Sequence, residues 1–415
     1  MLLVLYNNER VGKLWGENRV LHFRYEEKWL KTKNSFPLSP RLPLNNRFFA
    51  GDEVVFFFSN LLPEGPILAS LLKLKHLPIG DVYAQLEAFG EDAAGAFAVV
   101  PESQGKQRKP SYESYPLRAL RADLERLKQN QPLLIQHLDL RLSLAGVQNK
   151  IAVKYEKGKF WLPAGGAAST HILKPAIQPE REFANSVLNE ALCLRLARLS
   201  GLDAAEAEVV RLPQPVLLIK RYDRQWNQNK IIRLHQLDFC QLAGVLPDQK
   251  YEKDGGPSIS TLFALIDEHA RLAGRDRLKL IDWVIFNYLI GNADAHGKNL
   301  AMLVEPSGRL SLAPAYDLLC TAVYPNLDAR MAMAIGGEYR PEWVRTKNWK
   351  QFSENVHINP SLLKKRSREL AKRTINYFSQ AVALLENKRA LPITAKIKRI
   401  IIQRARWLET NQEGM

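Results

Sequence analysis

The sequence predicts an α+β protein in three parts: a small α+β unit, a strand-rich lobe and a helical lobe. Strand-like and helix-like patterns alternate over the first hundred residues, a polar stretch follows, and apolar residues take helical spacing almost throughout after about residue 260. With 415 residues the chain is too long for one ordinary core, so two or three packed units are expected. We place the boundaries at 1–101, 102–137, 138–259 and 260–415.

The first unit, residues 1–101, opens with a hairpin signal, because the strand-forming runs LLVLY and VGKLW flank the turn residues NNER. Residues 48–75 then pass from a strand-like aromatic run, through Pro-Glu-Gly, into a helix-like pattern. Residues 81–101 predict a further helix, a glycine-marked turn and a strand. The unit is therefore expected to be a small α+β subdomain.

The polar stretch 102–116 is typical of a linker, and we expect it to continue through a connecting helix to residue 137. From about residue 138 strand-like patterns dominate, in LDLRLSL, KIAVKYEKGKFWLP, THILKP and EVVRLPQPVLLIKRYDR. One strong helix over residues 183–201 interrupts them and ends at a glycine. The last part is expected to be helical, apart from short strand-like pieces near 301–313.

The chain is strongly basic, with a formal charge of +16 from 59 Lys and Arg against 43 Asp and Glu. This excess favours an acidic partner, either nucleic acid or an anionic substrate, although a merely basic surface is an open alternative. Part of it lies in KKRSRELAKR (364–373) and KIKRIIIQRAR (396–406), whose Leu and Ile spacing predicts amphipathic helices with basic faces.

The cysteines and the N-terminus indicate the compartment. Cys193, Cys240 and Cys320 lie far apart and are too few for a disulfide framework. The N-terminus lacks the pattern of a signal peptide, and no apolar run approaches the ~20 residues that cross a bilayer. We expect a reduced, cytoplasmic protein.

The segment NADAHGKN, residues 292–299, follows an apolar run and offers catalytic side chains. Protein-kinase-type enzymes use D-x-x-x-x-N, in which the Asp accepts the proton of the substrate hydroxyl and the Asn holds magnesium. Asp294 and Asn299 match this spacing, and Asp317 follows where a second metal-binding carboxylate is needed. Magnesium prefers such oxygen ligands, together with water and phosphate. Asp and Asn are also ordinary turn residues, so the pattern alone leaves a simple loop open.

Two further segments suit the phosphates of a nucleotide. Residues 141–155 form a turn of small residues between strand-like segments, where backbone N–H groups can bind phosphate. The turn has one glycine, Gly146, and no complete glycine-rich motif, so a plain β-turn is the simpler interpretation. Lys174, at the end of THILKP, is either a strand lysine that pairs with ATP phosphates or one that reaches solvent. Glu190 is a candidate partner, with a solvated helix residue as the simpler alternative.

The segment VLLIKRYDR, residues 216–224, is an apolar strand that turns polar, which is typical of a hinge between lobes or of a strand that emerges into solvent. Backbone groups at Lys220 and Tyr222 are candidates to meet an adenine edge, and Asp223 is a candidate for the ribose hydroxyls.

His296 lies two residues after Asp294. Without a second histidine at ligand spacing, a phosphate or orientation contact suits it better than a metal. Each segment is weak alone. Their order favours a two-lobed kinase, because phosphate loop, lysine, hinge, catalytic segment and metal carboxylate follow one another as such an enzyme requires.

These segments together are similar to the HipA-type serine/threonine kinases, the toxins of bacterial toxin–antitoxin systems, over nearly the whole chain. The motifs in the N-terminal unit are NLLPEGP and FGEDAAGAFAVVP. Those in the catalytic part are SLAGVQNK, THILKP, NEALCLRLA, KRYDR, HQLDFCQLAG with KYEKDGGPSI, LIGNADAHGKN and APAYDL. The resemblance implies a two-lobed protein-kinase-like (PI3/4-kinase-like) fold with a strand-rich N-lobe and an all-helical C-lobe.

The resemblance also implies residue roles. Asp294 would be the catalytic base, assisted by His296, and Asn299 and Asp317 would bind Mg2+. The expected ATP-binding residues are Gly146, Val147, Gln148, Asn149, Lys150, Lys174, Lys220, Tyr222, Asp223, His296 and Lys298. Ser143 would match the family's autophosphorylated serine. Two departures, Lys220 in place of a frequent Glu and NADAHGKN in place of T-D-G-H-A-K-N, remove no catalytic side chain.

The resemblance finally implies partners. We expect a toxin that is inactivated by autophosphorylation at Ser143 and inhibited by a helix-turn-helix, HipB-like antitoxin, in a complex that binds operator DNA. The expected substrate is a translation factor such as an aminoacyl-tRNA synthetase, whose phosphorylation arrests growth and produces persistence. The basic surface would then be an auxiliary DNA contact.

Two alternatives are open. The first is a catalytically weak pseudokinase that serves as a DNA-binding corepressor with its antitoxin; the intact Asp294, Asn299 and Asp317 favour catalysis over it. The second is a small-molecule kinase, which shares the core but has no reason to carry the unit 1–101.

Overall fold

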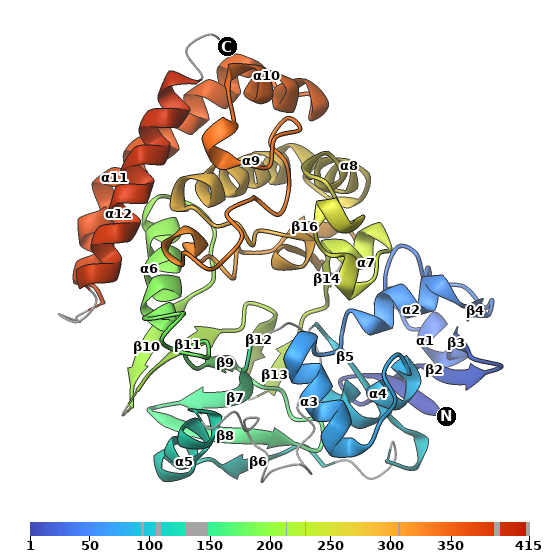
Figure 1. Ribbon diagram of the computed structural model, residues 1–415. Coiled ribbons are helices and arrows are strands. Elements are labelled where there is room, and N and C mark those ends of the chain that lie inside the picture. The colour runs from blue at the N-terminus through green and yellow to red at the C-terminus, as the bar shows by residue number, and fades with distance from the viewer. Residues whose placement is uncertain are drawn as a thin grey trace.

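The computed structural model describes residues 1–92, 95–104, 109–128, 148–212, 214–228, 230–305, 308–385 and 391–411. Figure 1 shows an N-terminal unit beside a strand-rich lobe, with helices α6 to α12 and a small sheet forming the rest of the molecule. The predicted α+β class and the sequence of a strand-rich and then a helical lobe are confirmed.

The N-terminal unit is an antiparallel sheet of order β4-β3-β2-β1-β5 with short helices packed on it. The strands are β1 (Leu2–Tyr6), β2 (Glu9–Glu17), β3 (Val20–Tyr25), β4 (Phe49–Ala50) and β5 (Phe97–Pro101), and the helices are α1 (Glu27–Leu30), α2 (Asp52–Ser59), α3 (Gly65–Lys75) and α4 (Val82–Phe89). The predicted hairpin is confirmed: Asn7 and Asn8 join β1 to β2 with φ of 45° and 69°, as tight hairpin turns require.

The aromatic run that begins at residue 48 was predicted to be a strand, and this is wrong for most of its length. Only Phe49 and Ala50 pair as β4, and helix α2 begins directly after Gly51. A continuous apolar run does not distinguish a buried helix from a strand. Here Val54, Phe57 and Phe58 are the buried members, which is helical spacing, and acidic residues occupy the first turn.

The strand-rich lobe is a sheet of order β10-β11-β9-β7-β8-β6. Its strands are β6 (Ser111–Ser114), β7 (Ile151–Glu156), β8 (Lys159–Ala164), β9 (His171–Lys174), β10 (Ala207–Arg211) and β11 (Pro215–Lys220). Strand β6 lies within the stretch that was predicted to be a linker. Its polar sequence gives no strand signal, but an edge strand can pair through its backbone without apolar side chains. Helix α5 (Leu117–Lys128) packs Leu120, Leu124 and Leu127 on this sheet. The predicted strand LDLRLSL lies outside the described residues.

Helix α6 (Ser186–Leu199) contacts β10 and β11, and its predicted end is confirmed, since Gly201 follows with φ of 95°. After β11 the chain forms a hairpin, β12 (Arg224–Asn227) and β13 (Lys230–Arg233), which was not predicted. It then enters a second small sheet of order β14-β15-β16.

The C-terminal lobe is helical but not all-helical. Its helices are α7 (Phe239–Ala243), α8 (Ile259–His269), α9 (Ala273–Ile290), α10 (Thr346–Asn355), α11 (Pro360–Ala383) and α12 (Leu391–Thr410), and its small sheet contains β14 (Gln236–Asp238), β15 (Ala301–Val304) and β16 (Leu310–Leu312). The strand-like pieces expected near 301–313 are therefore β15 and β16. Strand β15 pairs with β16 and also with β14, so the loop after α9 returns the chain to a position beside β14.

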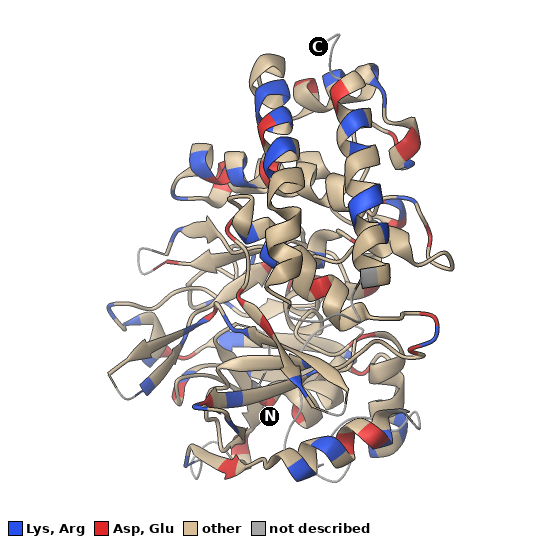
Figure 2. Cartoon of the chain, turned by 90° about the vertical axis from the view of Figure 1, so that its left-hand side faces the viewer, with Lys and Arg blue, Asp and Glu red and all other residues tan. Residues whose placement is uncertain are grey.

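Helices α11 and α12 lie side by side at the outer edge of this lobe, where Figure 2 shows Lys and Arg along them. The predicted amphipathic pattern is confirmed, since Leu363, Leu370, Ile397 and Ile401 are buried while residues such as Lys365, Arg368, Lys396 and Arg399 are exposed. In the described part of the chain, no helix combines the length and the apolarity that would be needed to span a membrane.

One buried cluster runs from the N-terminal sheet through α6 to the C-terminal helices, and it includes Phe57, Leu192, Phe239 and Phe286. The N-terminal unit is thus packed against the lobes rather than tethered beside them. Because apolar burial is non-directional, the specific register of this contact depends on polar bonds, among them His235 Nε2 to the Leu38 carbonyl at 2.7 Å.

Candidate functional site

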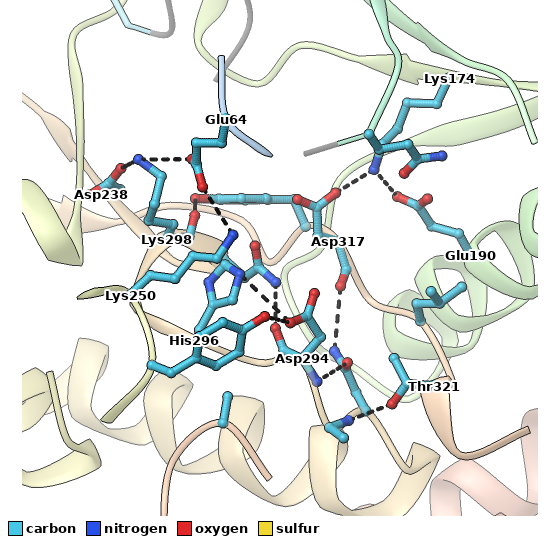
Figure 3. A pocket seen from close by; sticks show the side chains of 18 of the residues that line it. Glu64, Lys174, Glu190, Asp238, Lys250, Asp294, His296, Lys298, Asp317 and Thr321 are labelled. Atoms are coloured by element: carbon cyan, nitrogen blue, oxygen red, sulfur yellow. Dashed lines mark hydrogen bonds and ion pairs between the residues drawn. The ribbon is translucent and has the colours of Figure 1, made fainter. Parts of the chain in front are cut away.

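The three parts of the chain surround one pocket of about 860 Å3. The N-terminal unit contributes Asn60, Leu61 and Glu64 to its wall, the strand-rich lobe contributes Lys150, Lys174 and the segment 219–223, and the C-terminal lobe contributes the loop after α9 and the segment around Asp317. Figure 3 shows the charged side chains from these parts turned toward one another. The pocket brings most of the predicted site residues together.

The catalytic segment owes its shape to the end of α9. Gly291 adopts φ of 70° and closes the helix, which frees the chain to turn. Asn292 then holds the turn: its Nδ2 donates to Asn287 Oδ1 at 2.7 Å, and its Oδ1 accepts from the backbone of Asp294 at 3.1 Å. A Cβ on Gly297 would lie 2.5 Å from Pro257, so the loop also packs closely against the segment that contains Pro257.

The carboxylate of Asp294 faces the pocket, with 52% of its side chain exposed. The Tyr251 hydroxyl donates to Asp294 Oδ1 at 2.6 Å. Desolvation raises the pKa of Asp294 above its ordinary value, while the Tyr251 hydrogen bond and Lys250 oppose the rise. A carboxylate with a raised pKa in an open pocket is suited to accept a proton.

Asn299 and Asp317 present oxygen atoms beside Asp294. Asn299 Nδ2 donates to the Asp294 carbonyl at 2.7 Å, so its Oδ1 is the end of the amide that is left for a ligand. Asp317 adopts φ of 53°, a left-handed conformation that Asp tolerates better than most residues, and its carbonyl accepts from Asn292 at 3.4 Å. Among the described residues no cluster of three or more His, Cys, Asp and Glu forms a closed metal cage. One carboxylate and one amide fit magnesium, which keeps water and phosphate as further ligands.

Lys174 joins two carboxylates in the buried wall of the pocket. Its Nζ lies 2.8 Å from Glu190 Oε1 and 2.5 Å from Asp317 Oδ1, so the candidate partner Glu190 is a buried ion-pair residue and not a solvated one. Burial by itself lowers the pKa of Lys174, but the two carboxylates outweigh it and raise that pKa above its ordinary value. Burial would raise the pKa of Asp317, but Lys174 and Lys150 lower it to about 2. The Asp317 carboxylate and the Lys174 ammonium are therefore both charged.

The end of the predicted phosphate loop reaches the same wall. Gln148 and Lys150 line the pocket, and Gln148 Nε2 donates to the Pro175 carbonyl at 3.0 Å, whereas Asn149 precedes β7 and is not among the pocket-lining residues. Burial and the neighbouring Lys174 lower the pKa of Lys150 to about 8, against the opposing effect of Asp317. Ser143, Gly146 and Val147 lie outside the described residues.

The predicted hinge lines the pocket, but several of its groups are already engaged. The Lys220 backbone N–H donates to the Glu206 carbonyl at 2.8 Å, and the Lys220 side chain is exposed beside Glu206. Tyr222 donates its hydroxyl to Gln236 Oε1 at 2.5 Å and stacks near Tyr316 with 5.8 Å between ring centroids.

Asp223 lines the pocket and is held by two arginines. Both of its carboxylate oxygens accept from Arg221, at 2.9 and 2.7 Å, and Arg224 donates to Oδ2 at 2.8 Å. Although burial opposes ionisation, these arginines hold the pKa of Asp223 well below its ordinary range. A buried carboxylate needs such partners, and its contact with a ribose stays a prediction.

Lys298 lines the pocket and is engaged by the N-terminal unit. Its Nζ donates to Asn60 Oδ1 at 2.7 Å and to Asp238 Oδ2 at 3.0 Å, and lies 3.5 Å from Glu64 Oε1. Burial would lower its pKa, but Asp238 and Glu64 raise it. The ammonium therefore joins the predicted catalytic segment to the N-terminal unit, and its contact with a nucleotide stays a prediction.

His296 is buried against the ring of Tyr251, with ring centroids 5.1 Å apart. Its Nε2 lies 3.9 Å from Asp294 Oδ1, and its Nδ1 has no hydrogen-bond partner among the described residues. Burial and the neighbouring lysines Lys250 and Lys298 lower the pKa of His296 to about 3, so the ring is neutral at physiological pH.

Sequence reasoning left Tyr251, Lys250 and Glu64 without roles. Lys250 Nζ lies 3.0 Å from Glu64 Oε2, and Tyr251 is bound to Asp294. All three lie in segments that carry the family resemblance, KYEKDGGPSI and NLLPEGP, but each segment lies far along the chain from residue 294, and nothing in their spacing indicates a contact.

The arrangement can perform group transfer from an anionic substrate. Asp294 can receive a proton, Lys150 and Lys174 can neutralise phosphate, and Asn299 with Asp317 can hold a hard cation between them. No single residue carries this inference. It depends on all of them facing one pocket (Figure 3).

Comparisons with known proteins give a consistent picture. Residues 142–382 match the model of the HipA-like C-terminal domain, and residues 2–100 match that of the HipA N-terminal domain. The chain is 37% identical over 383 residues to a Sinorhizobium fredii protein named "Putative kinase Y4mE", covering 88% of this chain and 90% of that one. It is 29% identical over 377 residues to the serine/threonine-protein kinase toxin HipA of Shewanella oneidensis, covering 87% and 84%.

A solved structure is similar over the whole chain. It is the Shewanella oneidensis toxin–antitoxin complex of HipA, HipB and operator DNA, to a chain of which this one is 27% identical, with a TM-score of 0.87. The match covers 100% of this chain and 99% of that chain.

Proposed function

Because the chain belongs to the HipA family of serine/threonine kinases, we propose that it transfers the γ-phosphoryl group of ATP to a serine or threonine hydroxyl of a protein, with Asp294 as general base. The observation that supports the assignment of roles is that Asp294 lines the same pocket as Asn299, Asp317 and the Lys174–Glu190 pair.

The proposed step is a single displacement. The acceptor oxygen bonds to the γ-phosphorus while its proton passes to the Asp294 carboxylate, and the bond from the γ-phosphorus to the β,γ-bridging oxygen breaks, leaving ADP with that electron pair. Lys174 and Lys150 would neutralise the phosphates, and Gln148 and Asn149, with Gly146 and Val147 before them, would contribute backbone groups.

Asn299 and Asp317 would hold magnesium through their side-chain oxygens. When bound, the ion would neutralise charge on the phosphates. Because Lys174 lowers the pKa of Asp317, that carboxylate is ionised and would be available to the ion. Tyr222 and backbone groups near Lys220 would meet the adenine, and His296, neutral and packed on Tyr251, would orient the catalytic segment.

We propose that the chain acts as the toxin of a toxin–antitoxin module in the cytoplasm. Its partners would be a helix-turn-helix, HipB-like antitoxin and, through that complex, operator DNA, with the basic faces of α11 and α12 as an auxiliary contact. The substrate would be a translation factor such as an aminoacyl-tRNA synthetase. Autophosphorylation at Ser143 would inactivate the kinase. We also propose residues 1–101 as one unit of the chain. The boundaries at 137 and 259 are not kept, since β6 pairs in the strand-rich sheet and β14 pairs with β15 of the C-terminal lobe.

A pseudokinase corepressor is the alternative, and it would need the antitoxin interface but not the catalytic pocket. The paired Lys174 and Glu190 and the ionised Asp317 favour catalysis, since a corepressor has no use for buried charges that cost desolvation.

The test is phosphoproteomics after brief expression of the wild type and of Asp294→Ala. We expect new phosphoserine or phosphothreonine sites and growth arrest with the wild type only, since loss of a general base typically costs ~10²–10⁴-fold. Equal phosphorylation and equal arrest with a folded Asp294→Ala would refute the assignment.

A further inference from the structure

The Tyr251 hydroxyl donates to Asp294 Oδ1 at 2.6 Å, across 43 residues of sequence. This bond engages one of the two carboxylate oxygens of Asp294, which Figure 3 shows among the charged side chains of the pocket. We propose that Tyr251 is a positioning residue for phosphoryl transfer: it holds one oxygen of Asp294, so that the other oxygen is presented to the acceptor hydroxyl. This inference rests on the proposed function.

The phenol ring is itself held in place. It packs edge-on against His296, three positions before Asn299, and the Lys250 carbonyl accepts from the backbone of Gly297 at 3.4 Å. The Tyr251 carbonyl accepts from Gly256 at 2.9 Å, which closes the short turn that carries the ring. The hydroxyl therefore reaches Asp294 from a segment that is bonded to the catalytic loop.

Glu252, the residue after Tyr251, is hydrogen-bonded to a second segment, residues 332–334. The Glu252 backbone N–H donates to the Ala332 carbonyl at 3.2 Å, and Glu252 Oε2 accepts from Ala334 at 2.6 Å. Tyr251 thus stands between the catalytic loop and the segment 332–334, both of which line or border the pocket. Because its neighbours are fixed, a side chain at this position can orient Asp294 without an ordering cost at each turnover.

The N-terminal unit extends this arrangement. Glu64 Oε2 lies 3.0 Å from Nζ of Lys250, the residue before Tyr251, and both side chains are largely buried, with 10% and 12% exposed. Glu64 Oε1 lies 3.5 Å from Nζ of Lys298, which precedes Asn299. One carboxylate of the N-terminal unit thus joins the Tyr251 segment to the catalytic segment, and we extend the positioning role to it.

The packing of the Tyr251 ring against His296 does not require the hydroxyl group. A phenylalanine would make the same ring contact with His296, but it would leave Asp294 Oδ1 without this donor. A carboxylate that turns freely spends less time in the geometry for proton transfer, and misplacement of a catalytic group by about 1 Å can cost ~10²-fold. Burial, and then the charge of Asp294, raise the pKa of Tyr251 above its ordinary value, so the phenol remains a hydrogen-bond donor.

The experiment measures autophosphorylation of the full chain with γ-labelled ATP, as initial rate against ATP concentration. The variants are Tyr251→Phe and Glu64→Gln, with Asp294→Asn as the catalytic reference. Matched controls are Tyr377→Phe on α11 and Glu53→Gln, whose carboxylate pairs with Arg47 on the surface of the N-terminal unit at 3.1 Å. Thermal unfolding of each variant reports folding.

We expect Tyr251→Phe to lower the maximum rate about 10- to 100-fold, with the half-saturating ATP concentration within about twofold of the wild type. Glu64→Gln should lower the maximum rate about 3- to 10-fold, and should have little further effect in a Tyr251→Phe background, because the two act on one carboxylate. Tyr251→Phe should likewise add little to Asp294→Asn. Both controls should match the wild type.

Three outcomes overturn the inference. A Tyr251→Phe variant with wild-type or higher maximum rate shows that the hydroxyl is not needed. A loss that appears only in half-saturating ATP concentration assigns Tyr251 to nucleotide binding, and a full additional loss on top of Asp294→Asn separates it from Asp294. If the wild type and Asp294→Asn incorporate label equally, the proposed function itself fails and the inference fails with it.

Discussion

Lys174 on β9 and Glu190 on α6 form a buried ion pair, with 2.8 Å between Nζ and Oε1. The same ammonium reaches Asp317, 143 residues further along the chain. The Lys174 ammonium thus joins strand β9 of the strand-rich lobe, helix α6 and the loop that carries Asp317 in the C-terminal lobe. Activity should depend on all three.

Replacement of this ammonium should remove activity and also destabilise the fold. We expect Lys174→Met to lower the phosphorylation rate by about 10²-fold or more and to lower the melting temperature, because Glu190 is left buried without its partner. Glu190→Gln keeps an acceptor oxygen and should cost less, about 10-fold. Lys365→Met and Glu369→Gln, an exposed pair on α11, are the matched controls and should change neither rate nor melting temperature. A fully active Lys174→Met would contradict the role.

The magnesium requirement should depend on Asn299 as an oxygen donor. We expect Asn299→Asp, which keeps an oxygen ligand, to retain a rate that rises with magnesium, and Asn299→Leu to need at least about 10-fold more magnesium or to lose activity. Asp317→Asn should be inactive and less stable than the wild type, since Asn tolerates the left-handed φ of 53° but removes one of the two charged partners of the buried Lys174. Magnesium titrations of the rate, with calorimetric unfolding, test both. Identical magnesium curves for the Asp and Leu variants would exclude Asn299 as a ligand.

Acid should weaken the contact of the N-terminal unit through His235. Burial lowers the pKa of His235 to about 4, although the Leu38 carbonyl and Asp223 oppose the shift. The unfolded chain binds a proton near the ordinary value of about 6.5, and the folded chain binds it only near 4, so stability is full above 6.5 and is lost as pH falls through this window. The loss from about pH 7 to pH 5 should be roughly 2 kcal/mol.

The control for this prediction is His235→Gln, whose amide can still donate to Leu38 but does not titrate. Its unfolding free energy, from denaturant melts, should be lower than that of the wild type at about pH 7 but should fall less toward pH 5. Parallel losses in both proteins would assign the acid sensitivity to other groups.

A phosphate on Ser143 should expel nucleotide. Ser143 lies five residues before Gln148, which lines the pocket, so the chain can bring it within about 18 Å of that position. A phosphate adds about −1.5 to −2 charges, which would repel ATP and the carboxylates of Asp294 and Asp317. We expect Ser143→Asp to bind ATP poorly and Ser143→Ala to bind it normally in calorimetric titrations. An unmodified Ser143 after incubation with Mg-ATP, together with equal affinities, would show that the serine only starts a turn.

The predictable part of the fold and the site is local. The hairpin at Asn7 and Asn8 and the helix that ends at Gly201 were confirmed, because turn chemistry and apolar spacing act over a few residues. The helix α2 was missed for a related reason: in a continuous apolar run, the face that is buried depends on the neighbours. The family, too, was predictable, since its motifs are short segments in a set order, and the comparisons confirm it.

The residue types that can perform the chemistry, at Asp294, Asn299, Asp317 and Lys174, are therefore visible in the sequence, because their spacing and order are local patterns. What each charged group faces became known from the folded arrangement. The side chains of Asp223 and Lys298 are engaged by buried partners, whereas Tyr251 and Glu64 come to the pocket from distant segments. The physical reason is that a buried charge must be compensated by whichever group the fold places beside it, and that neighbour is not encoded in sequence spacing.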